Sequence, residues 1–323
     1  MREFLINGND AGQRLDKWLT KALPALPQSL LHKYIRLKRI KCNGKRCELN
    51  YRLQPGDTLQ LYINDEFFEK PDPDNAWRSL APKLEIVYED EQILLADKKP
   101  GMVVHEDESG DADTLINHIK AYLYSKGEWD PDKENTFAPA LCNRIDRNTG
   151  GIVIAAKTAE ALRILNDKIK DRELDKQYLC LVHGTPKPAE GILENFLTRD
   201  LKEKRVFITK TRGPGALTAK TGYKVLESRG GLSLVECTLY TGRTHQIRAQ
   251  MSHAGHPLAG DTKYGTAKQN QGLPFFGQAL YAYKLTFRFK KDAGALQYLN
   301  GRSFRVEAVP FLEYFRKLPK GGK

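Results

Sequence analysis

The chain has 323 residues and a formal net charge of +12, from 52 Lys and Arg against 40 Asp and Glu. Its length is sufficient for a large core and predicts two domains. No apolar run is long enough to cross a bilayer, and the first ten residues lack the apolar segment of a signal peptide. We therefore expect a cytoplasmic protein without a membrane partner.

The cysteines indicate neither disulfides nor a zinc knuckle, because their number is odd and no pair has the Cys-x-x-Cys spacing. They are Cys42, Cys47, Cys142, Cys180 and Cys237. The positive charge indicates a polyanionic partner, with nucleic acid ahead of a membrane surface.

The charge is concentrated at the N-terminus. Residues 1–62 contain 12 Lys and Arg against 5 Asp and Glu, a net charge of +7. This short segment holds more than half of the net charge of the chain. It therefore indicates a separate basic module.

The pattern of this module predicts two helices followed by two strands. Apolar residues at helical spacing predict a helix over residues 11–23 and a second from Ser29 to about Leu37. A short strand from Ile40 leads to an Asn-Gly turn, and residues 53–63 combine a Pro-Gly turn with an alternating strand.

The segments "RLDKWL", "SLLHKYIRLKRIKCNGKR" and "LQPGDTLQL" resemble the small RNA-binding domain shared with a small-subunit ribosomal protein, the S-four-like or αL domain. The resemblance covers nearly all of residues 11–63 and implies an RNA-binding face. Its candidate contacts are Arg14, Lys33, Arg36, Lys38 and Arg39. The alternative is that these cations form only a solvated face, but their clustering favours RNA.

Residues 64–83 are acidic, rich in proline and without clear periodicity. This composition predicts a linker. We expect it to tether the module of residues 1–63 without fixing its orientation.

A second domain is predicted over residues 84–323. Short strands are expected around residues 86–87, 93–95, 176–184, 218–228, 232–240 and 281–289, with helices at 114–127 and 157–174. Because no βαβ repeat and no Gly-x-Gly-x-x-Gly occurs, the pattern predicts an α+β fold with a mixed, largely antiparallel sheet and flanking helices. The small α/β module precedes it.

Three stretches of this domain hold candidate site residues. "NRIDRNTGG" places Asp146 on a turn before an apolar strand, and "KQYLCLV" places Tyr178 in a strand. The third, residues 240–265, contains Arg243, His245, Arg248, His253 and His256. Taken singly, Asp146 could merely cap its turn, and Tyr178 could be an ordinary half-buried strand tyrosine.

Common catalytic motifs are missing from the sequence. His253 and His256 are three residues apart, but no His-Glu-x-x-His and no carboxylate at the usual spacing accompanies them, so a metal site is not indicated. The chain has no Gly-x-Ser-x-Gly elbow, no P-loop and no zinc deaminase signature. These absences disfavour serine hydrolases, nucleotide hydrolases and zinc deaminases.

Together the three stretches resemble the RNA pseudouridine synthases of the RluA class. Residues 143–151 are similar to the family's H-R-L-D-x-x-T-S-G, Lys176-Gln177-Tyr178 to K-x-Y, and residues 242–248 to G-R-T-H-Q-[IL]-R. Upstream, "DKKPGMVVH" is similar to N-K-P-x-G-[ML]-x-V-H. The resemblance spans about residues 84–310. With the αL domain in front, the order resembles the bacterial enzymes of the large ribosomal subunit.

The resemblance implies a role for each matching residue. Asp146 matches the catalytic aspartate, which attacks the ribose anomeric carbon or the uracil ring, so that the base detaches, rotates and rejoins through carbon. Arg248 matches its ion-pair partner. Tyr178 matches the tyrosine that stacks on the flipped uracil and accepts a ring proton, and Arg144 the residue that fills the vacated stack. Arg243 and His245 are further RNA-binding candidates. No cofactor and no metal is implied.

Physical chemistry is consistent with these roles. Flipping a base out of an RNA stack costs roughly a few kcal/mol, and a planar cation such as Arg144 can offset that cost. A carboxylate must be ionised to act as a nucleophile, and pairing with Arg248 favours the ionised form. We expect a bidentate guanidinium that also fixes the direction of the carboxylate.

The sequence departs from the family pattern at four positions. Asn143 replaces the usual histidine, Ile145 a leucine, Gly150 a serine, and Gln250 stands where a histidine is common. None of these changes removes Asp146 or Tyr178.

We therefore predict an enzyme that converts uridine to pseudouridine in structured RNA, with 23S ribosomal RNA as the expected substrate and a monomer as the expected state. The main alternative is a non-catalytic RNA-binding or ribosome-assembly factor on the same fold. It is supported only by the altered first motif. A glycosidase that never rejoins the base is a third, less favoured alternative.

Overall fold

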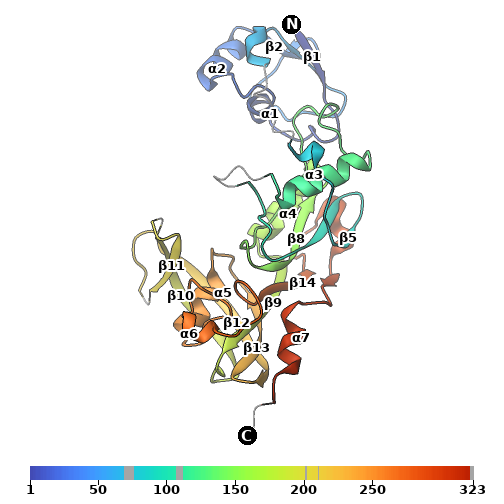
Figure 1. The fold of residues 1–323 in the computed structure, drawn as a ribbon. Helices are drawn as coiled ribbons and strands as arrows, with labels where there is room; N and C mark the ends of the chain where they lie inside the picture. The colour runs from blue at the N-terminus through green and yellow to red at the C-terminus, as the bar shows by residue number, and fades with distance from the viewer. Residues whose placement is uncertain (69–75, 107–111, 201, 210, 321–323) are drawn as a thin grey trace.

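A computed structural model describes residues 1–68, 76–106, 112–200, 202–209 and 211–320. Figure 1 shows a small N-terminal lobe stacked on one end of a longer body, with the two termini at opposite ends. Residues 69–75, inside the predicted linker, lie outside the described residues. None of the helices in the described ranges has the length and apolarity that crossing a bilayer requires.

The N-terminal lobe is a sheet of order β1-β4-β2-β3 against two helices. Its elements are β1 (Arg2–Leu5), α1 (Leu15–Ala22), α2 (Gln28–Arg36), β2 (Ile40–Cys42), β3 (Lys45–Arg46) and β4 (Thr58–Leu61). Helix α1 buries Leu15, Trp18 and Leu19, the residues whose spacing predicted it. The predicted Asn-Gly turn is confirmed, since Asn43 and Gly44 have φ of 53° and 73° and connect β2 to β3.

The two ends of the predicted linker pack on different cores. Short 3-10 helices, η1 (Asp65–Phe68) and η2 (Ala76–Ser79), precede and follow residues 69–75. Phe68 is buried in the core of the N-terminal lobe. Trp77 is buried in the core of the larger body, where its ring centre lies 5.2 Å from that of Trp129. The predicted domain boundaries at residues 63 and 83 stay predictions.

Polar contacts fix the two lobes to each other. The fully buried carboxylate of Asp10 accepts hydrogen bonds from Asn135 Nδ2 at 2.5 Å and Thr136 Oγ1 at 2.8 Å, both in the larger body. The same carboxylate accepts from the indole N–H of Trp18, in its own lobe, at 2.8 Å. Asp10 therefore connects the core of the N-terminal lobe with a loop of the other lobe. We call the contact of Asp10, Asn135 and Thr136 the interlobe joint.

Further bonds surround the interlobe joint. Asn7 and Asn9 donate to the carboxylate of Glu134 at 3.1 and 2.6 Å. The side-chain oxygen of Asn9 also accepts from the backbone N–H of Ala159, the first residue of helix α4 (Ala159–Lys170), at 3.1 Å. The expectation that residues 64–83 leave the orientation of the module open is therefore wrong, because loops outside that segment hold it.

The larger body is built on one mixed sheet, which has 11 strands in the described ranges and the order β11-β10-β12-β13-β9-β14-β8-β6-β5, with β15 on β14 and β7 on β8. Its strands are β5 (Ile86–Glu89), β6 (Ile93–Lys98), β7 (Ala140–Leu141), β8 (Gly150–Ala156), β9 (Leu174–His183), β10 (Glu190–Asp200), β11 (Arg205–Thr209), β12 (Leu217–Arg229), β13 (Leu232–Leu239), β14 (Leu280–Phe287) and β15 (Ser303–Arg305). The other helices are α3 (Leu115–Ser125), α5 (Gln246–His253), α6 (Ala267–Asn270), η3 (Gly294–Leu299) and α7 (Phe311–Lys317). All pairings are antiparallel except β8 with β14, so the predicted α+β class with a largely antiparallel sheet is confirmed.

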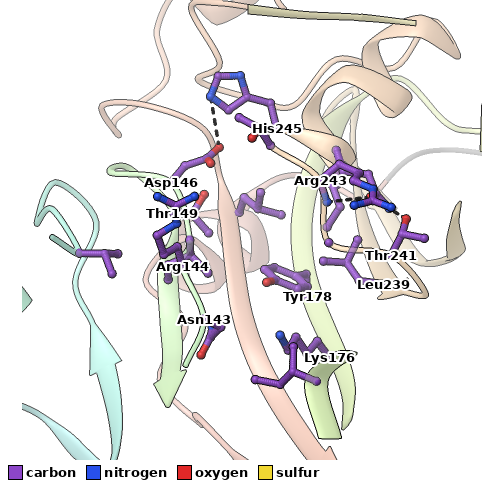
Figure 2. A pocket seen from close by; sticks show the side chains of 18 of the residues that line it. Asn143, Arg144, Asp146, Thr149, Lys176, Tyr178, Leu239, Thr241, Arg243 and His245 are labelled. Carbon is purple, nitrogen blue, oxygen red and sulfur yellow. Dashed lines mark hydrogen bonds and ion pairs between the residues drawn. The ribbon is translucent and has the colours of Figure 1, made fainter. Parts of the chain in front are cut away.

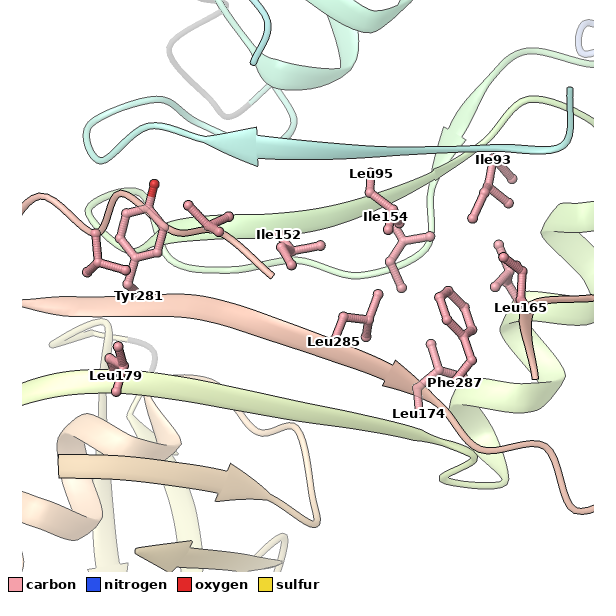
Figure 3. Packing of buried hydrophobic residues seen from close by; sticks show 14 of the residues in the cluster. Ile93, Leu95, Ile152, Ile154, Leu165, Leu174, Leu179, Tyr281, Leu285 and Phe287 are labelled. Carbon is pink, nitrogen blue, oxygen red and sulfur yellow. The ribbon is translucent and has the colours of Figure 1, made fainter. Parts of the chain in front are cut away.

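The centre of the sheet is buried on both faces. Along β6, Ile93 and Leu95 face one core, together with Leu165 of α4 (Figure 3), whereas Leu94 and Ala96 face another, with α3. Side chains of a strand alternate between faces, so such a strand is a continuous apolar run. This is why "ILLA" and "IVIAA" are recognisable as strands.

The same alternation aims strand β9 at the site. Leu179 and Leu181 pack into the core shown in Figure 3, while Tyr178 and Cys180 point to the opposite face. Helix α5 covers that opposite face through Ile247. The face of the sheet that carries Tyr178 is therefore the one to which α5 brings its polar side chains.

Candidate active site

Asp146 lies in the loop between β7 and β8, in a tight turn. The backbone N–H of Thr149 donates to the carbonyl of Asp146 at 3.0 Å. At the end of the turn, Gly151 has a φ of +111° and a side chain there would lie 2.3 Å from the carbonyl oxygen of Ala282. The loop is thus held directly against strand β14, and only glycine fits at this point.

Gly150, the residue before Gly151, makes room for a tyrosine ring. A Cβ atom on Gly150 would lie 2.3 Å from the ring of Tyr281, which is buried and donates its hydroxyl to Asp97 at 2.6 Å. The serine that the family pattern has at this position would collide with that ring. Gly150 is therefore explained by the packing of Tyr281.

Arg248 binds two carboxylates. Its Nη1 lies 2.8 Å from Oδ2 of Asp146, and its Nε and Nη2 bond to the two oxygens of Asp261 at 2.7 and 3.0 Å. The sequence predicted the pairing of Arg248 with Asp146, and the structure brings the two together across 102 positions. The expected bidentate contact with Asp146 is wrong, because Asp261 occupies that geometry. Among the described residues, no hydrogen bond reaches Oδ1 of Asp146.

His245 approaches the same carboxylate. Its Nε2 lies 3.8 Å from Oδ2 of Asp146, as the dashed line in Figure 2 marks, and its Nδ1 lies 3.0 Å from the hydroxyl of Tyr264. The residue precedes α5 with a left-handed φ of 52°. This turn brings His245 and Arg248 to one side of Asp146.

Tyr178 and Asp146 line one cavity of about 840 Å³. Figure 2 shows Tyr178 and Lys176 side by side on β9, with Asp146 above them on its loop. Arg144, Arg243, His245 and Arg248 also line the cavity, so the residues matched to the family motifs gather in one place, whereas His253 and His256 are not part of the lining. A volume of this size suits a small organic group such as a nucleobase with its sugar.

The charges and the burial shift three pKa values. Burial, followed by the nearby charge of Asp146, raises the pKa of the Tyr178 phenol. Burial lowers the pKa of His245, against the raising effect of Asp146. For Arg248, burial acts downwards, but Asp261 and then Asp146 outweigh it, and the pKa rises. At neutral pH Tyr178 is therefore a phenol and Arg248 a cation.

The two arginines beside Asp146 point elsewhere. Arg144 is exposed at the cavity, and within the described ranges its guanidinium has no hydrogen bond or ion pair. Arg147 donates through Nε to the carbonyl of Gly101 at 3.1 Å, while its own carbonyl accepts from Gly101 and from the ammonium of Lys98. Arg147 therefore ties the loop of Asp146 to the turn at residues 98–102.

The other departures from the family pattern also have structural roles. Asn143 accepts the backbone N–H of Ile154 at 2.9 Å and so fixes the start of the loop to strand β8. Gln250 is buried, accepts from Thr221 at 2.7 Å and donates to the carbonyl of Leu193 at 3.0 Å. Neither residue takes the place of Asp146. The altered first motif therefore leaves Asp146 paired with Arg248.

The αL candidates lie on the surface of the N-terminal lobe. Lys33, Arg36, Lys38 and Arg39 are exposed. Arg14 is also exposed but bonds to Asp16 through Nε and Nη2, at 3.1 and 2.9 Å. Arg14 is therefore the least free of the five to meet a phosphate.

Sequence reasoning missed three residues of this site, Lys98, Asp261 and Tyr264. Lys98 lies in "DKKPGMVVH", which is similar to a family motif, and Asp261 and Tyr264 lie within residues 240–265, the third candidate stretch. Their spacing carries no periodic signal, so only the contacts reveal them. In the part of the chain that the structure describes, no three His, Cys, Asp or Glu side chains could hold a metal ion together. His253 and His256 therefore form no such group.

Comparison with known proteins identifies the family. Residues 92–253 match the family model of RNA pseudouridylate synthases, and residues 13–59 match the S4 domain. The chain is 32% identical to "Uncharacterized RNA pseudouridine synthase YlyB" of Bacillus subtilis over 85% of its own length and 86% of the relative's. The chain belongs to the RNA pseudouridine synthases. The resemblance to the RluA class and to the αL domain is thus confirmed, and the enzyme converts uridine to pseudouridine in RNA.

A further relative supports this family, and two solved structures share the fold. The synthase is 30% identical to "Ribosomal large subunit pseudouridine synthase C" of Escherichia coli, over 94% of its own chain and 91% of the relative. "Human RNA Pseudouridylate Synthase Domain Containing 4" has the same fold, with a TM-score of 0.56 at 20% identity over 73% of this chain and 94% of that one. For "Human RNA Pseudouridylate Synthase Domain Containing 1" the TM-score is 0.53 at 22% identity, over 75% and 98%.

Proposed function

We propose that this synthase modifies large-subunit ribosomal RNA. The support is that a relative named for the large ribosomal subunit matches over nearly the whole of both chains, N-terminal lobe included. The surplus of cations in residues 1–62 suits a large, densely charged RNA. We also propose that the enzyme acts as a monomer, in the cytoplasm where ribosomes are assembled in bacteria.

We propose Asp146 as the nucleophile. The supporting observation is that its Oδ2 binds Arg248 and faces His245, whereas Oδ1 has no hydrogen bond among the described residues. The anionic carboxylate is thus held by one oxygen and offers the other to the cavity. Attack of Oδ1 on the ribose anomeric carbon displaces N1 of the uracil, whereas attack on the uracil ring gives an adduct in which the bond from the ribose to N1 breaks in a following step. The base then turns, C5 bonds to the anomeric carbon, the bond to Asp146 breaks so that its carboxylate is released, and C5 gives up its proton.

We propose that Tyr178 holds the uracil by stacking. Its buried ring lies on the floor of the cavity, on the strand face that α5 covers. Because burial and the charge of Asp146 raise the pKa of this phenol, it is protonated at neutral pH, and its oxygen accepts the C5 proton only as its own hydrogen passes to the released carboxylate of Asp146. Lys176, two residues earlier on the same strand, lines the same cavity.

We propose that Arg144 replaces the flipped base in the RNA stack. The guanidinium is exposed at the cavity mouth, and a planar cation can stack in the vacated place. Arg243 and His245 are proposed to contact the RNA at the opposite wall. Arg243 is the better placed of the two to do so, because its Nε already has a backbone acceptor, the carbonyl of Thr218 at 3.2 Å, that orients it.

We propose that the chain divides into an RNA-binding domain of residues 1–63, a linker of residues 64–83 and a catalytic domain of residues 84–323. The cores of the two lobes support this division, since Phe68 and Trp77 belong to different ones. Within the first domain we propose Lys33, Arg36, Lys38 and Arg39 as phosphate contacts, with Arg14 in a minor role.

The substrate proposal is tested with RNA from cells that lack the protein. Ribosomal RNA and transfer RNA from these cells are incubated separately with the purified enzyme, and pseudouridine is mapped chemically. We expect a new pseudouridine in 23S ribosomal RNA that is also absent from the mutant cells and present in the parent strain. A new pseudouridine in transfer RNA alone would overturn the choice of substrate.

A further inference from the structure

The hydroxyl of Tyr264 connects strand β11 to His245, the residue before helix α5. It accepts the backbone N–H of Val206, in β11, at 2.9 Å, and it lies 3.0 Å from Nδ1 of His245. Tyr264 is 7% exposed and packs among Val206 and Ala249. The ring is therefore held in place from three sides of the site.

These contacts decide which nitrogen of His245 carries the hydrogen. A phenol has a single hydrogen to donate, and the Tyr264 oxygen already accepts from Val206. In the described ranges His245 Nδ1 is the one acceptor within reach of that hydrogen, so the hydroxyl hydrogen has a partner only if Tyr264 donates to Nδ1. Neutral His245 then has its hydrogen on Nε2.

The contact of His245 Nε2, at the other end of the imidazole, favours the same tautomer. Nε2 lies 3.8 Å from Oδ2 of Asp146. An N–H directed at a carboxylate is attracted, whereas a nitrogen lone pair there is repelled. Both ends of the imidazole therefore favour hydrogen on Nε2.

Two cations strengthen the donor. The guanidinium carbons of Arg205 and Arg248 lie 4.8 and 5.2 Å from the ring centre of Tyr264. Positive charge beside a phenol stabilises electron density on its oxygen as the hydroxyl donates its hydrogen. The three groups form a chain in which the hydroxyl of Tyr264 orients the imidazole of His245, and the imidazole in turn faces the carboxylate of Asp146.

We propose that Tyr264 is a positioning residue that locks His245 in the Nε2–H tautomer, and that His245 thereby aligns Asp146. The N–H of His245 and Nη1 of Arg248 approach the same oxygen, Oδ2. Together they turn Oδ1 towards the cavity. The distance of 3.8 Å is longer than a hydrogen bond, and we expect it to shorten when RNA is bound. This inference rests on the proposed role of Asp146 as nucleophile.

The tautomer is measured directly by NMR. In protein labelled with nitrogen-15 in its histidines, the shifts of the two ring nitrogens distinguish the tautomers, and the His245→Gln variant identifies the signals of His245. We expect the wild type to show hydrogen on Nε2, and Tyr264→Phe to show a mixture of both tautomers. Hydrogen on Nδ1 in active wild-type enzyme would overturn the inference while leaving the proposed nucleophile intact.

Kinetics separate positioning from simple stability. We expect Tyr264→Phe to lower kcat about tenfold with KM changed less than about twofold, because the interaction acts on the reacting carboxylate. In the His245→Gln background the same substitution should have no further effect, since the amide presents its N–H without help from Tyr264. Equal losses in both backgrounds would contradict the coupling.

Two controls complete the test. Tyr283→Phe removes a partly buried hydroxyl of strand β14, one that donates to Glu236 outside the cavity lining. This variant should keep the kcat of the wild type. His245→Asn, whose amide is too short to reach the place of Nε2, should lose more activity than His245→Gln. If His245→Asn is as active as His245→Gln, the N–H towards Asp146 has no role.

Discussion

Asp261 holds the guanidinium of Arg248 by two hydrogen bonds, of 2.7 and 3.0 Å, and leaves only Nη1 for Asp146. Asp261 is fully buried, and its pKa is lowered: burial acts upwards, but Arg248 outweighs it. The nucleophile thus receives a cation whose position a second carboxylate has already fixed.

Asp261→Asn should therefore harm both folding and catalysis. A buried Arg248 left with one carboxylate should lower the free energy of unfolding by about 3–5 kcal/mol. Displacement of Nη1 from Asp146 should lower kcat by about 100-fold. Thermal unfolding and single-turnover kinetics measure the two effects. The matched control is Glu313→Gln, which breaks an exposed pair with Lys317 and should change stability by less than about 1 kcal/mol.

Asp146→Asn should abolish pseudouridine formation and leave RNA binding within about threefold of the wild type, because the amide keeps the shape of the side chain but lacks the nucleophilic charge. Tritium release from RNA labelled at uracil C5 reports the chemistry, and filter binding reports the affinity. An Asp146→Asn variant that still turns over would show that another group attacks the substrate.

Gly150→Ala should destabilise the fold, since the new methyl group would lie 2.3 Å from the ring of Tyr281. Overpacking of this kind lowers the free energy of unfolding by about 1–3 kcal/mol. Urea unfolding measures the loss. Gly213→Ala is the control, because no atom lies within 4 Å of a side chain there. Equal stability of the two variants would contradict the account of Gly150.

Removal of the donors at the interlobe joint should loosen the N-terminal lobe without unfolding it, because the bonds of Asn7 and Asn9 to Glu134 remain. The double variant Asn135→Ala, Thr136→Val removes two hydrogen bonds to Asp10 but keeps the bond from Trp18. Small-angle X-ray scattering should show a larger radius of gyration, and RNA affinity should fall about tenfold as preorganisation is lost. Thr20→Val, which removes an exposed hydroxyl that donates to the carbonyl of Asp16 in its own helix, should change neither.

Deprotonation of Lys98 is expected to lower the activity of the enzyme at alkaline pH. Its buried ammonium donates to the carbonyls of Lys99, Met102 and Arg147 at 3.0, 2.8 and 2.8 Å, and burial lowers its pKa to about 8, against a raising effect of Asp146. Above that pH the neutral amine has two hydrogens for three carbonyls, so the loop of Asp146 loosens. We expect kcat/KM to fall reversibly as the pH rises through about 8.

The free energy of unfolding should rise over the pH range in which the activity falls. Because the folded pKa lies below that of an unfolded lysine, the unfolded chain binds more protons between the two values, and the contribution of Lys98 to the free energy of unfolding rises with pH in that window. Loss of activity there is thus distinct from unfolding. Lys98→Arg, which keeps its charge, should be less active but flat across this range. An unchanged alkaline limb in Lys98→Arg would exclude Lys98 as its cause.

The sequence allowed the central elements and the central pair of the site to be predicted. Leu15, Trp18 and Leu19 have helical spacing because they face one core, and Ile93 to Ala96 form an apolar run because both faces of β6 are buried. Asp146 and Arg248 were paired through the resemblance to a family, since no pattern in the chain links residues 102 positions apart.

Other features left no readable pattern. Strand β10 exposes the side chain of Ile192 at 58%, and apolar and polar residues do not alternate along its sequence. For this reason the β10–β11 hairpin was not predicted. Asp261 and Tyr264 act through single contacts with Arg248 and His245, which depend on the folded chain alone. The same holds for Asp10, a polar residue in a loop that sequence rules assign to the surface.

The interlobe joint fixes the distance between the N-terminal lobe and the active site. With Asp10 locked to Asn135 and Thr136, the cationic helix α2 stands at a constant offset from Asp146. If α2 contacts an RNA helix as proposed, we expect the enzyme to favour, among uridines of similar local sequence, the one whose distance from that helix matches the offset. A change of target is then expected from substitutions that alter the spacing between α2 and the loop of Asp146, at residues far from the chemistry, with the cavity unchanged.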